Sequence, residues 1–440
     1  MKRTIKLMLA SVLLAAMMVP VLATTWYVSP DGKKKNEGTS PDKPIKAIWS
    51  AVEAAQPGDT ILVAEGNYTG KASCGFIEIN KPLKIYGGYS KDFSERNIAK
   101  YQTSIRPSID MNATPPKNGT VEFIDLDKYP DGVTVFDGFI LDHSEVNAYH
   151  ATDGKPEGVE TGMWLEPPSK GNYKYASLKK YLIYGNTNGD ITISNCLFLN
   201  SSFYAINLNH HTGTVNITNN VFLGSRMMAC NVSCRSAKAF ATVLNFEYNT
   251  VLFTWSRTKD FGDMGYGVRA LSKVDANICN NILGLSIMSG FDNSQNNRKG
   301  EQKVTLDENM FFLNKKGDVS FTVSPNIKYI KVEDDAFEDV EDFDGMESCE
   351  DNVSLDDPSV FAGILDPAYL NGFLNAAYTE SADYDADSEA NQLRAAMGLN
   401  TVGSIKSKVT MYANKYPFSD NIFKLWGAVE DYGAQELPEE

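Results

Sequence analysis

The feature that most constrains the fold of this chain is a strand pattern that recurs with the same corner. Six segments share it, each with an alternating strand, then a small or Asn residue, then a second apolar strand. They read VTVFDGFIL from Val133, ITISNCLFL from Ile191, VNITNNVFL from Val215, LNFEYNTVL from Leu244, ANICNNILG from Ala276 and VTLDENMFF from Val304. Recurrence at roughly 20–50 residues indicates stacked units, in which each unit packs only on its neighbours.

Aligning the segments places one column of residues at the corner between the two strands. The column holds Gly138, Cys196, Asn220, Asn249, Asn281 and Asn309. Asn and Gly tolerate the left-handed backbone of a sharp corner, and stacked Asn side chains can hydrogen-bond between layers. The pattern predicts an all-β chain wound as a right-handed parallel β-helix. An antiparallel sandwich with Asn-rich turns is the alternative, but it accounts poorly for a corner at one phase of the repeat.

The start of the chain is typical of a secretory signal. Lys2, Arg3 and Lys6 precede an apolar run that ends at Leu22, and small residues follow. This run is shorter than the roughly 20 apolar residues that a membrane-spanning helix needs. We therefore expect residues 1–23 to be removed and the mature chain, with no transmembrane segment, to be periplasmic, cell-surface or secreted.

Charge and cysteine spacing exclude several kinds of protein. The net charge of −15 argues against a general nucleic-acid binder, which needs clustered Lys and Arg. The six cysteines fit neither a small disulfide scaffold nor a zinc site. Cys230 and Cys234 would lie about 13 Å apart on one strand, too far to bridge. We expect both to be free thiols that face inward.

The chain divides into four regions. After the signal, 24–330 holds the repeats, and within it Pro44 to Gln56 has the three- and four-residue apolar spacing of a helix that could cover the open edge of the first coil. Residues 331–357 are densely acidic and are expected to form a solvated linker. Residues 358–440 contain helix signals and are expected to form a small mixed C-terminal cap on the last coils.

The N-terminal segments resemble a known class of proteins. They read WYVSPDG from Trp26, EGTSPDKPIKAIWSAVEAAQPGDTILVAEGNY from Glu37, KPLKIYGGYS from Lys81 and FDGFIL from Phe136. They are similar to the opening of secreted bacterial β-helix proteins of the pectate-lyase-like superfamily, which carry a domain of unknown function at their start. The resemblance implies the fold rather than one activity, because this fold hosts lyases, hydrolases, adhesins and phage tailspikes.

Stacking the strands that follow the corner suggests a candidate active site. YAINLNHH from Tyr204, CNVSCR from Cys230 and VRALSK from Val268 would place two columns outward. The first holds Asn207, Asn231 and Arg269, and the second His211, Arg235 and Lys273. A base beside cations is what β-elimination of a uronate requires, so His211, Arg235, Arg269 and Lys273 are candidate catalytic residues, with Asn207 and Asn231 binding substrate. The alternative is an ordinary polar outer face, and a one-residue slip would reverse the facing.

Two further segments are candidates for ligand binding. The excursion 144–189 is rich in aromatic residues, including Trp164, Tyr181 and Tyr184, which could stack on sugars or simply pack the loop. Near the C-terminus, acidic residues alternate in a pattern that suits Ca²⁺ ligands or the start of a helix. These are Asp383, Asp385, Asp387 and Glu389.

The resemblance and the cationic column together predict a protein that interacts with polysaccharide. The leading hypothesis is a lyase that cleaves an acidic glycan by β-elimination, with Ca²⁺ as a candidate cofactor. A non-catalytic glycan-binding surface protein or adhesin, and a structural envelope protein, are the alternatives.

Overall fold

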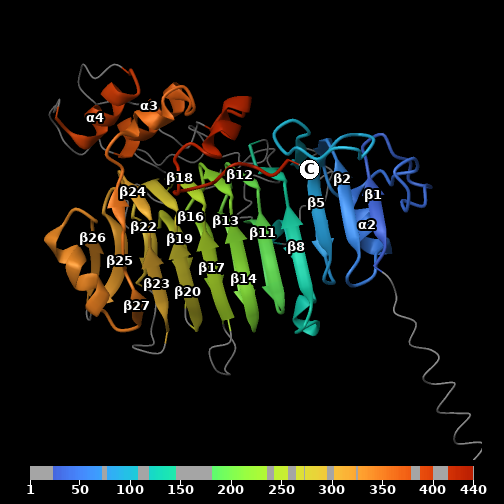
Figure 1. Ribbon diagram of the computed structural model, residues 1–440, viewed down its shortest axis with the longest axis horizontal. Coiled ribbons are helices and arrows are strands. Elements are labelled where there is room, and N and C mark those ends of the chain that lie inside the picture. The colour runs from blue at the N-terminus through green and yellow to red at the C-terminus, as the bar shows by residue number, and fades with distance from the viewer. Residues whose placement is uncertain are drawn as a thin grey trace, which may run out of the picture.

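The computed structural model describes residues 23–71, 77–107, 118–144, 181–234, 242–255, 264–271, 273–294, 302–323, 326–377, 387–399 and 415–439. The body of the molecule is a right-handed parallel β-helix, as predicted, in which three long sheets run side by side along one axis (Figure 1). Nearly all of the expected signal peptide, residues 1–22, lies outside the described residues.

A complete coil contributes one strand to each sheet, in the order A, B, C. Sheet A consists of β1 (Thr25–Val28), β2 (Thr60–Ala64), β5 (Lys84–Tyr89), β8 (Val133–Asp137), β11 (Asp190–Ser194), β14 (Gly213–Thr218), β17 (Thr242–Glu247), β20 (Val274–Cys279), β23 (Val304–Asp307) and β27 (Met346–Ser348). Sheet B consists of β3 (Gly66–Tyr68), β6 (Thr103–Ile105), β9 (Ile140–Asp142), β12 (Leu197–Leu199), β15 (Val221–Leu223), β18 (Thr250–Thr254), β21 (Ile282–Ser286), β24 (Met310–Phe312) and β28 (Val353–Ser354). Sheet C consists of β4 (Ile77–Ile79), β7 (Gly119–Phe123), β10 (Tyr181–Thr187), β13 (Tyr204–His210), β16 (Met228–Ser233), β19 (Tyr266–Ala270), β22 (Ser289–Asn293), β25 (Gly317–Val323) and the antiparallel β26 (Asn326–Ile330).

The interior is filled by the alternate apolar residues of all three sheets. Ile191 and Ile193 of β11 are fully buried there, and Phe198 of β12 stacks on Phe222 of β15 with ring centroids 4.6 Å apart. Period-two alternation in strands explains this arrangement, since every second side chain faces the core. Free Cys230 on β16 also faces inward, as the sequence predicts.

A column of residues, most of them buried Asn, connects successive coils at the corner between sheets A and B. We call this the corner ladder; it comprises Cys196, Asn220, Asn249, Asn281, Asn309 and Asn352. The backbone N–H of each member except the last donates to the Oδ1 of the next, at 2.9 Å from Asn249 to 3.2 Å from Asn281. Each Nδ2 also donates to backbone carbonyls, for example from Asn249 to Ile217 at 2.7 Å. The ladder thus satisfies backbone groups at a turn where sheet pairing cannot reach them.

The left-handed backbone lies one residue before the ladder, not in it. Asn195, Asn219, Tyr248, Asn280, Glu308 and Asp351 have φ from 51° to 56°. Gly138 shares this conformation, with φ of 78°, and its neighbour Asp137 pairs with Ser194. Gly138 therefore corresponds to the left-handed Asn195 and not to Cys196. The sequence alignment of Gly138 with Cys196 was wrong by one residue.

A short helix closes the first coil. The helix α2 (Ile48–Ala54) is shorter than the predicted Pro44–Gln56, and it buries Ile48, Ala51 and Val52. It contacts β1, β2 and β4 at the N-terminal end of the solenoid (Figure 1). This position matches the expected role of covering an open edge.

The acidic region 331–357, expected to be a linker, contributes to the last coil. Its strand β27 pairs with β23 and its strand β28 pairs with β24. Between β26 and β27, the 3₁₀ helix η2 (Asp335–Asp342) buries Val340 while most of its acidic side chains remain exposed. Composition suggests a solvated linker here because acids dominate, but Asn352 supplies the corner residue that one more coil needs.

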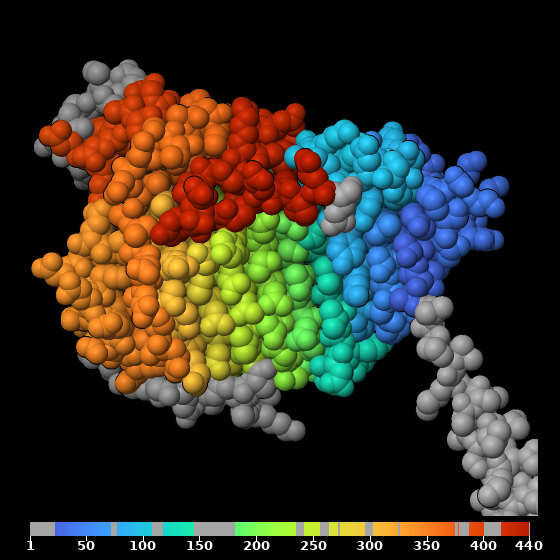
Figure 2. Space-filling view, viewed as in Figure 1, coloured from blue at the N-terminus to red at the C-terminus, as the bar shows by residue number. Residues whose placement is uncertain are grey.

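The C-terminal region packs along the outer face of sheet B rather than only on the last coils. It contains η3 (Pro358–Phe361), α3 (Pro367–Ala377), α4 (Glu389–Ala396) and η5 (Asp420–Leu425). Trp255, just after β18, meets Phe373 of α3 with ring centroids 4.2 Å apart. The final segment then runs back along the solenoid (Figure 2), where Trp426 donates to the Asn219 carbonyl and Asn97 donates to Glu439.

Replacing Asn249 by Ala should destabilise the protein by about 2–4 kcal/mol, because buried partner groups on two coils would lose their hydrogen bonds. Asn245→Ala is the matched control. Asn245 lies on the same coil and hydrogen-bonds Asn216 and Asn277, but it does so on the partly exposed outer face of sheet A. Urea unfolding should show a much larger loss for Asn249→Ala. Equal losses would mean that the corner ladder has no special role.

Candidate functional site

The outer face of sheet C carries a continuous column of polar side chains. Strand pairing places Tyr184 beside Asn207, Asn207 beside Asn231, and Asn231 beside Arg269, with Asp292 next. We call these five residues the sheet C column. The predicted registration of Asn207, Asn231 and Arg269 is therefore confirmed. Asn231 donates from Nδ2 to Oδ1 of Asn207 at 2.7 Å, which orients the Asn207 amide.

Arg269 is committed to a buried ion pair. Its Nε donates to Asp292, and the side chains of both residues are almost completely buried. Asp292 also accepts from Ser320 Oγ at 2.6 Å. The Arg269 guanidinium lies over the Tyr266 ring, 4.3 Å from its centroid. A guanidinium held in this way does not face solvent, and removing it would leave the Asp292 charge buried without a partner.

The strand pairing ends before the predicted second column of His211, Arg235 and Lys273, so that column stays a prediction. The strand pairs end at Asn209 with Ser233 and at Val232 with Ala270. His211 follows β13, and Lys273 lies at a buried corner before β20 with φ of 65°. Arg235 lies outside the described residues. Period-two spacing holds within a strand, so it cannot be extrapolated across the corner that follows.

Two buried histidines near this face were not among the predicted site residues. His210 ends β13 and its Nδ1 lies 2.8 Å from Thr187 Oγ1, while burial lowers its pKa to about 4. His143 lies 2.6 Å from Thr120 Oγ1, and burial lowers its pKa to about 3. Both are therefore neutral near pH 7. Their proximity to small hydroxyl side chains of neighbouring coils gives them a structural role.

An aromatic cluster lies on β10 and β13 beside the accessible end of the sheet C column. Tyr181 stacks on Tyr184 at 5.1 Å and approaches Phe203 and Tyr204 at 5.1 and 5.5 Å. All four rings are only half-buried. Asn207 is also half-buried, whereas Asn231, Arg269 and Asp292 are buried. The surface open to a ligand is thus this aromatic cluster with the neighbouring amides.

Sequence reasoning found part of this cluster. It placed Tyr181 and Tyr184 in an excursion that ends at residue 189, but both belong to the regular strand β10. Trp164 lies outside the described residues. Phe203 and Tyr204 carry no loop signal, and only the pairing of β13 with β10 brings them to Tyr181.

The described residues contain no group of three or more His, Cys, Asp and Glu side chains able to hold a metal ion. Of the four candidate Ca²⁺ ligands, Asp383 and Asp385 lie outside the described residues. Glu389 opens α4 and forms an ion pair with Lys331, and Asp387 is exposed before the Ser388 cap. The Ca²⁺ site stays a prediction. The positions of Asp387 and Glu389, the two candidates that the structure describes, fit the alternative of acidic residues at the start of a helix.

Five cysteines are free thiols in the described part of the chain: Cys196, Cys230, Cys234, Cys279 and Cys349. No helix among the described residues is long and apolar enough to cross a membrane.

No family model and no curated protein matches this chain. Among solved structures it is similar to pectate lyase Pel9A, with 15% identity and a TM-score of 0.37 over 67% of this chain and 71% of that one. A GH136 lacto-N-biosidase from Eubacterium ramulus has 13% identity and a TM-score of 0.36, covering 67% and 57%. A rhamnogalacturonan lyase has 12% identity and a TM-score of 0.31, covering 70% and 87%. These likenesses assign no activity to this chain, and its fold rests on its own strand pairing.

Replacing Arg269 by Met should destabilise the protein by about 3–5 kcal/mol, because the buried Asp292 charge would lose its partner. Adding Asp292→Asn should recover most of that loss, since the amide removes the charge and keeps an acceptor for Ser320. Lys91→Met, which breaks the exposed pair with Asp31, should change stability little. Denaturant unfolding measures all three. An Arg269→Met variant as stable as the parent would show that the guanidinium is free for another role.

Proposed function

We propose that this protein is an exported, non-catalytic binder of polysaccharide, and that it holds a glycan chain on the outer face of sheet C over β10 and β13. The observation that carries the proposal is the half-buried aromatic cluster of Tyr181, Tyr184, Phe203 and Tyr204 beside the Asn207 amide. The resemblance of the N-terminal segments to secreted β-helix proteins supports export.

The chemistry of this surface suits sugar rings. Aromatic faces offer broad apolar contact to the C–H face of a sugar, and the Tyr hydroxyls remain available for hydrogen bonds. The amides of Asn186 and Asn209 hydrogen-bond each other at 3.0 Å on the same strands, so they form a second row of donors and acceptors. The strands β10 and β13 belong to adjacent coils and present these groups about 4.8 Å apart. Two adjacent rows of this kind suit consecutive sugar units of a chain.

Binding without cleavage is favoured over catalysis by the state of the ionisable groups. Arg269, the cation of the sheet C column, is buried in its pair with Asp292, and the rings of His210 and His143 are buried beside Thr hydroxyls rather than open to a ligand. A lyase that acts on an acidic glycan by β-elimination is the second candidate. Arg269 beside Asn231 is the observation that favours it, and it would require the ion pair to open.

Tyr184→Ala and Tyr204→Ala should each weaken glycan binding by about threefold to tenfold, since each removes one ring of the platform. The measurement is affinity electrophoresis in gels that contain neutral or uronate-rich polysaccharides. Tyr248→Asn is the matched control. It removes an exposed ring near the corner ladder, at a left-handed position where three other coils already have Asn.

The same samples separate the candidate functions. Retention that depends on Tyr184 and Tyr204, with no rise in ultraviolet absorbance, supports binding. An unsaturated product that absorbs in the ultraviolet and disappears in Arg269→Lys would instead establish the lyase. Retention by no polysaccharide, or equal retention of the tyrosine variants, would contradict the proposed site.

A further inference from the structure

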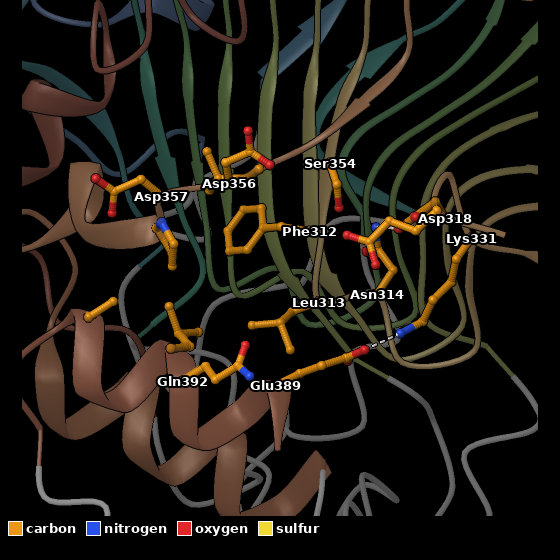
Figure 3. A pocket seen from close by; sticks show the side chains of 15 residues that line it. Phe312, Leu313, Asn314, Asp318, Lys331, Ser354, Asp356, Asp357, Glu389 and Gln392 are labelled. Carbon is orange, nitrogen blue, oxygen red and sulfur yellow. Dashed lines mark hydrogen bonds and ion pairs between the residues drawn. The ribbon is translucent and has the colours of Figure 1, made fainter. Parts of the chain in front are cut away.

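A cavity of about 380 Å³ lies where the last coils meet the C-terminal region, and its lining residues include none of the five residues of the sheet C column. Its walls come from β24 and β25 with the residues that follow β24, from the chain after β26, from β28 with the residues after it, and from α4 (Figure 3). Ligand pockets typically range from about 300 to 1,000 Å³, so a small molecule fits.

One wall of the cavity is apolar. Phe312 lines the cavity although its side chain is almost fully buried. Leu313, Leu355 and Leu393 line the same wall. Figure 3 shows the Phe312 ring between the acidic residues on either side. A ring of this kind can contact the apolar face of a ligand and can also attract a cation.

The polar lining has an excess of negative charge. Five carboxyl groups line the cavity (Asp318, Glu333, Asp356, Asp357 and Glu389) against the single ammonium of Lys331. Lys331 is already paired with Glu389 across the mouth, which links the solenoid to α4 (Figure 3). Asp356 is exposed and has no hydrogen-bond or ion-pair partner among the described residues. Charge complementarity therefore favours a cationic ligand and disfavours a uronate.

The deepest carboxyl group is held in place by its neighbours. Asp318 accepts from Asn314 Nδ2 and from the Val332 backbone N–H, both at 2.9 Å. Burial raises its pKa to about 6. These contacts fix Asp318, and Glu389 is paired with Lys331. The exposed Glu333, Asp356 and Asp357 are the carboxyl groups left at the rim, and Asp356 and Asp357 are consecutive in the chain.

We propose that this cavity binds an amino sugar, with the protonated amine at Asp356 and Asp357 and the ring against Phe312. Ser354 and Gln392 then provide hydrogen bonds for the ring hydroxyls. This site is separate from the aromatic cluster on sheet C, and it does not depend on the glycan-binding function proposed above.

The test is isothermal titration of the full-length protein with glucosamine, glucose, N-acetylglucosamine and glucuronate. Glucosamine should bind most tightly, because it alone offers both the hydroxyls and a free cation. The double variant Asp356→Asn/Asp357→Asn should weaken glucosamine binding by about tenfold or more, since two charge-assisted contacts become neutral. Asn at 357 can still accept from the Ser359 N–H, so the local turn is retained.

Glu338→Gln/Asp339→Asn is the matched control, because it removes the same charge from the exposed face of η2 outside the cavity. It should bind glucosamine as the parent does, and so should Tyr184→Ala. No glucosamine binding, equal binding of glucose, or unchanged binding by the Asp356/Asp357 variant with its thermal stability intact would each overturn the proposal. Loss of glucosamine binding in Tyr184→Ala would instead place the glucosamine site on sheet C.

Discussion

The structure depends on how each coil satisfies its backbone at the corner between sheets A and B. Sheet pairing supplies partners for the strands, but a sharp corner leaves amides and carbonyls that face the interior. The fully buried side chains of Asn220, Asn249, Asn281 and Asn309 accept and donate there at once. An unmade hydrogen bond at a buried site costs about 1–3 kcal/mol. The ladder therefore strongly constrains where the corner falls within each repeat. Because the corner fixes where each strand starts, it also fixes which side chains face outward.

The outer faces of the three sheets differ in what covers them. Sheet A presents a partly exposed row in which Asn216, Asn245 and Asn277 hydrogen-bond one another. Sheet B is covered by the C-terminal region, whose α3 and final segment bury apolar residues such as Leu197 and Leu252. Sheet C combines a buried ion pair at Arg269 with open aromatic rings on β10 and β13. The candidate surface for an extended ligand is therefore on sheet C.

Much of the fold can be predicted from sequence, because the corner pattern and the strand alternation are local signals. They gave the solenoid, the inward residues and the registration of Asn207 with Asn231 and Arg269. The pattern failed where tertiary pairing overrides composition. The acidic run before Asn352 resembles a linker, yet β27 and β28 extend the sheets. The Arg269–Asp292 pair could not be anticipated, since it joins residues on coils whose spacing varies.

Hydrogen exchange over 303–312 and 346–354 tests the central claim most directly. If the corner ladder continues through Asn309 to Asn352, the backbone amides of Asn309 and Val353 should exchange slowly, because the first donates to Asn352 Oδ1 and the second to the Asn309 carbonyl. Protection in 346–354 should fall when Asn352 is replaced by Ala. Rapid exchange of 346–354 in the parent protein, as expected of a solvated linker, would contradict the account.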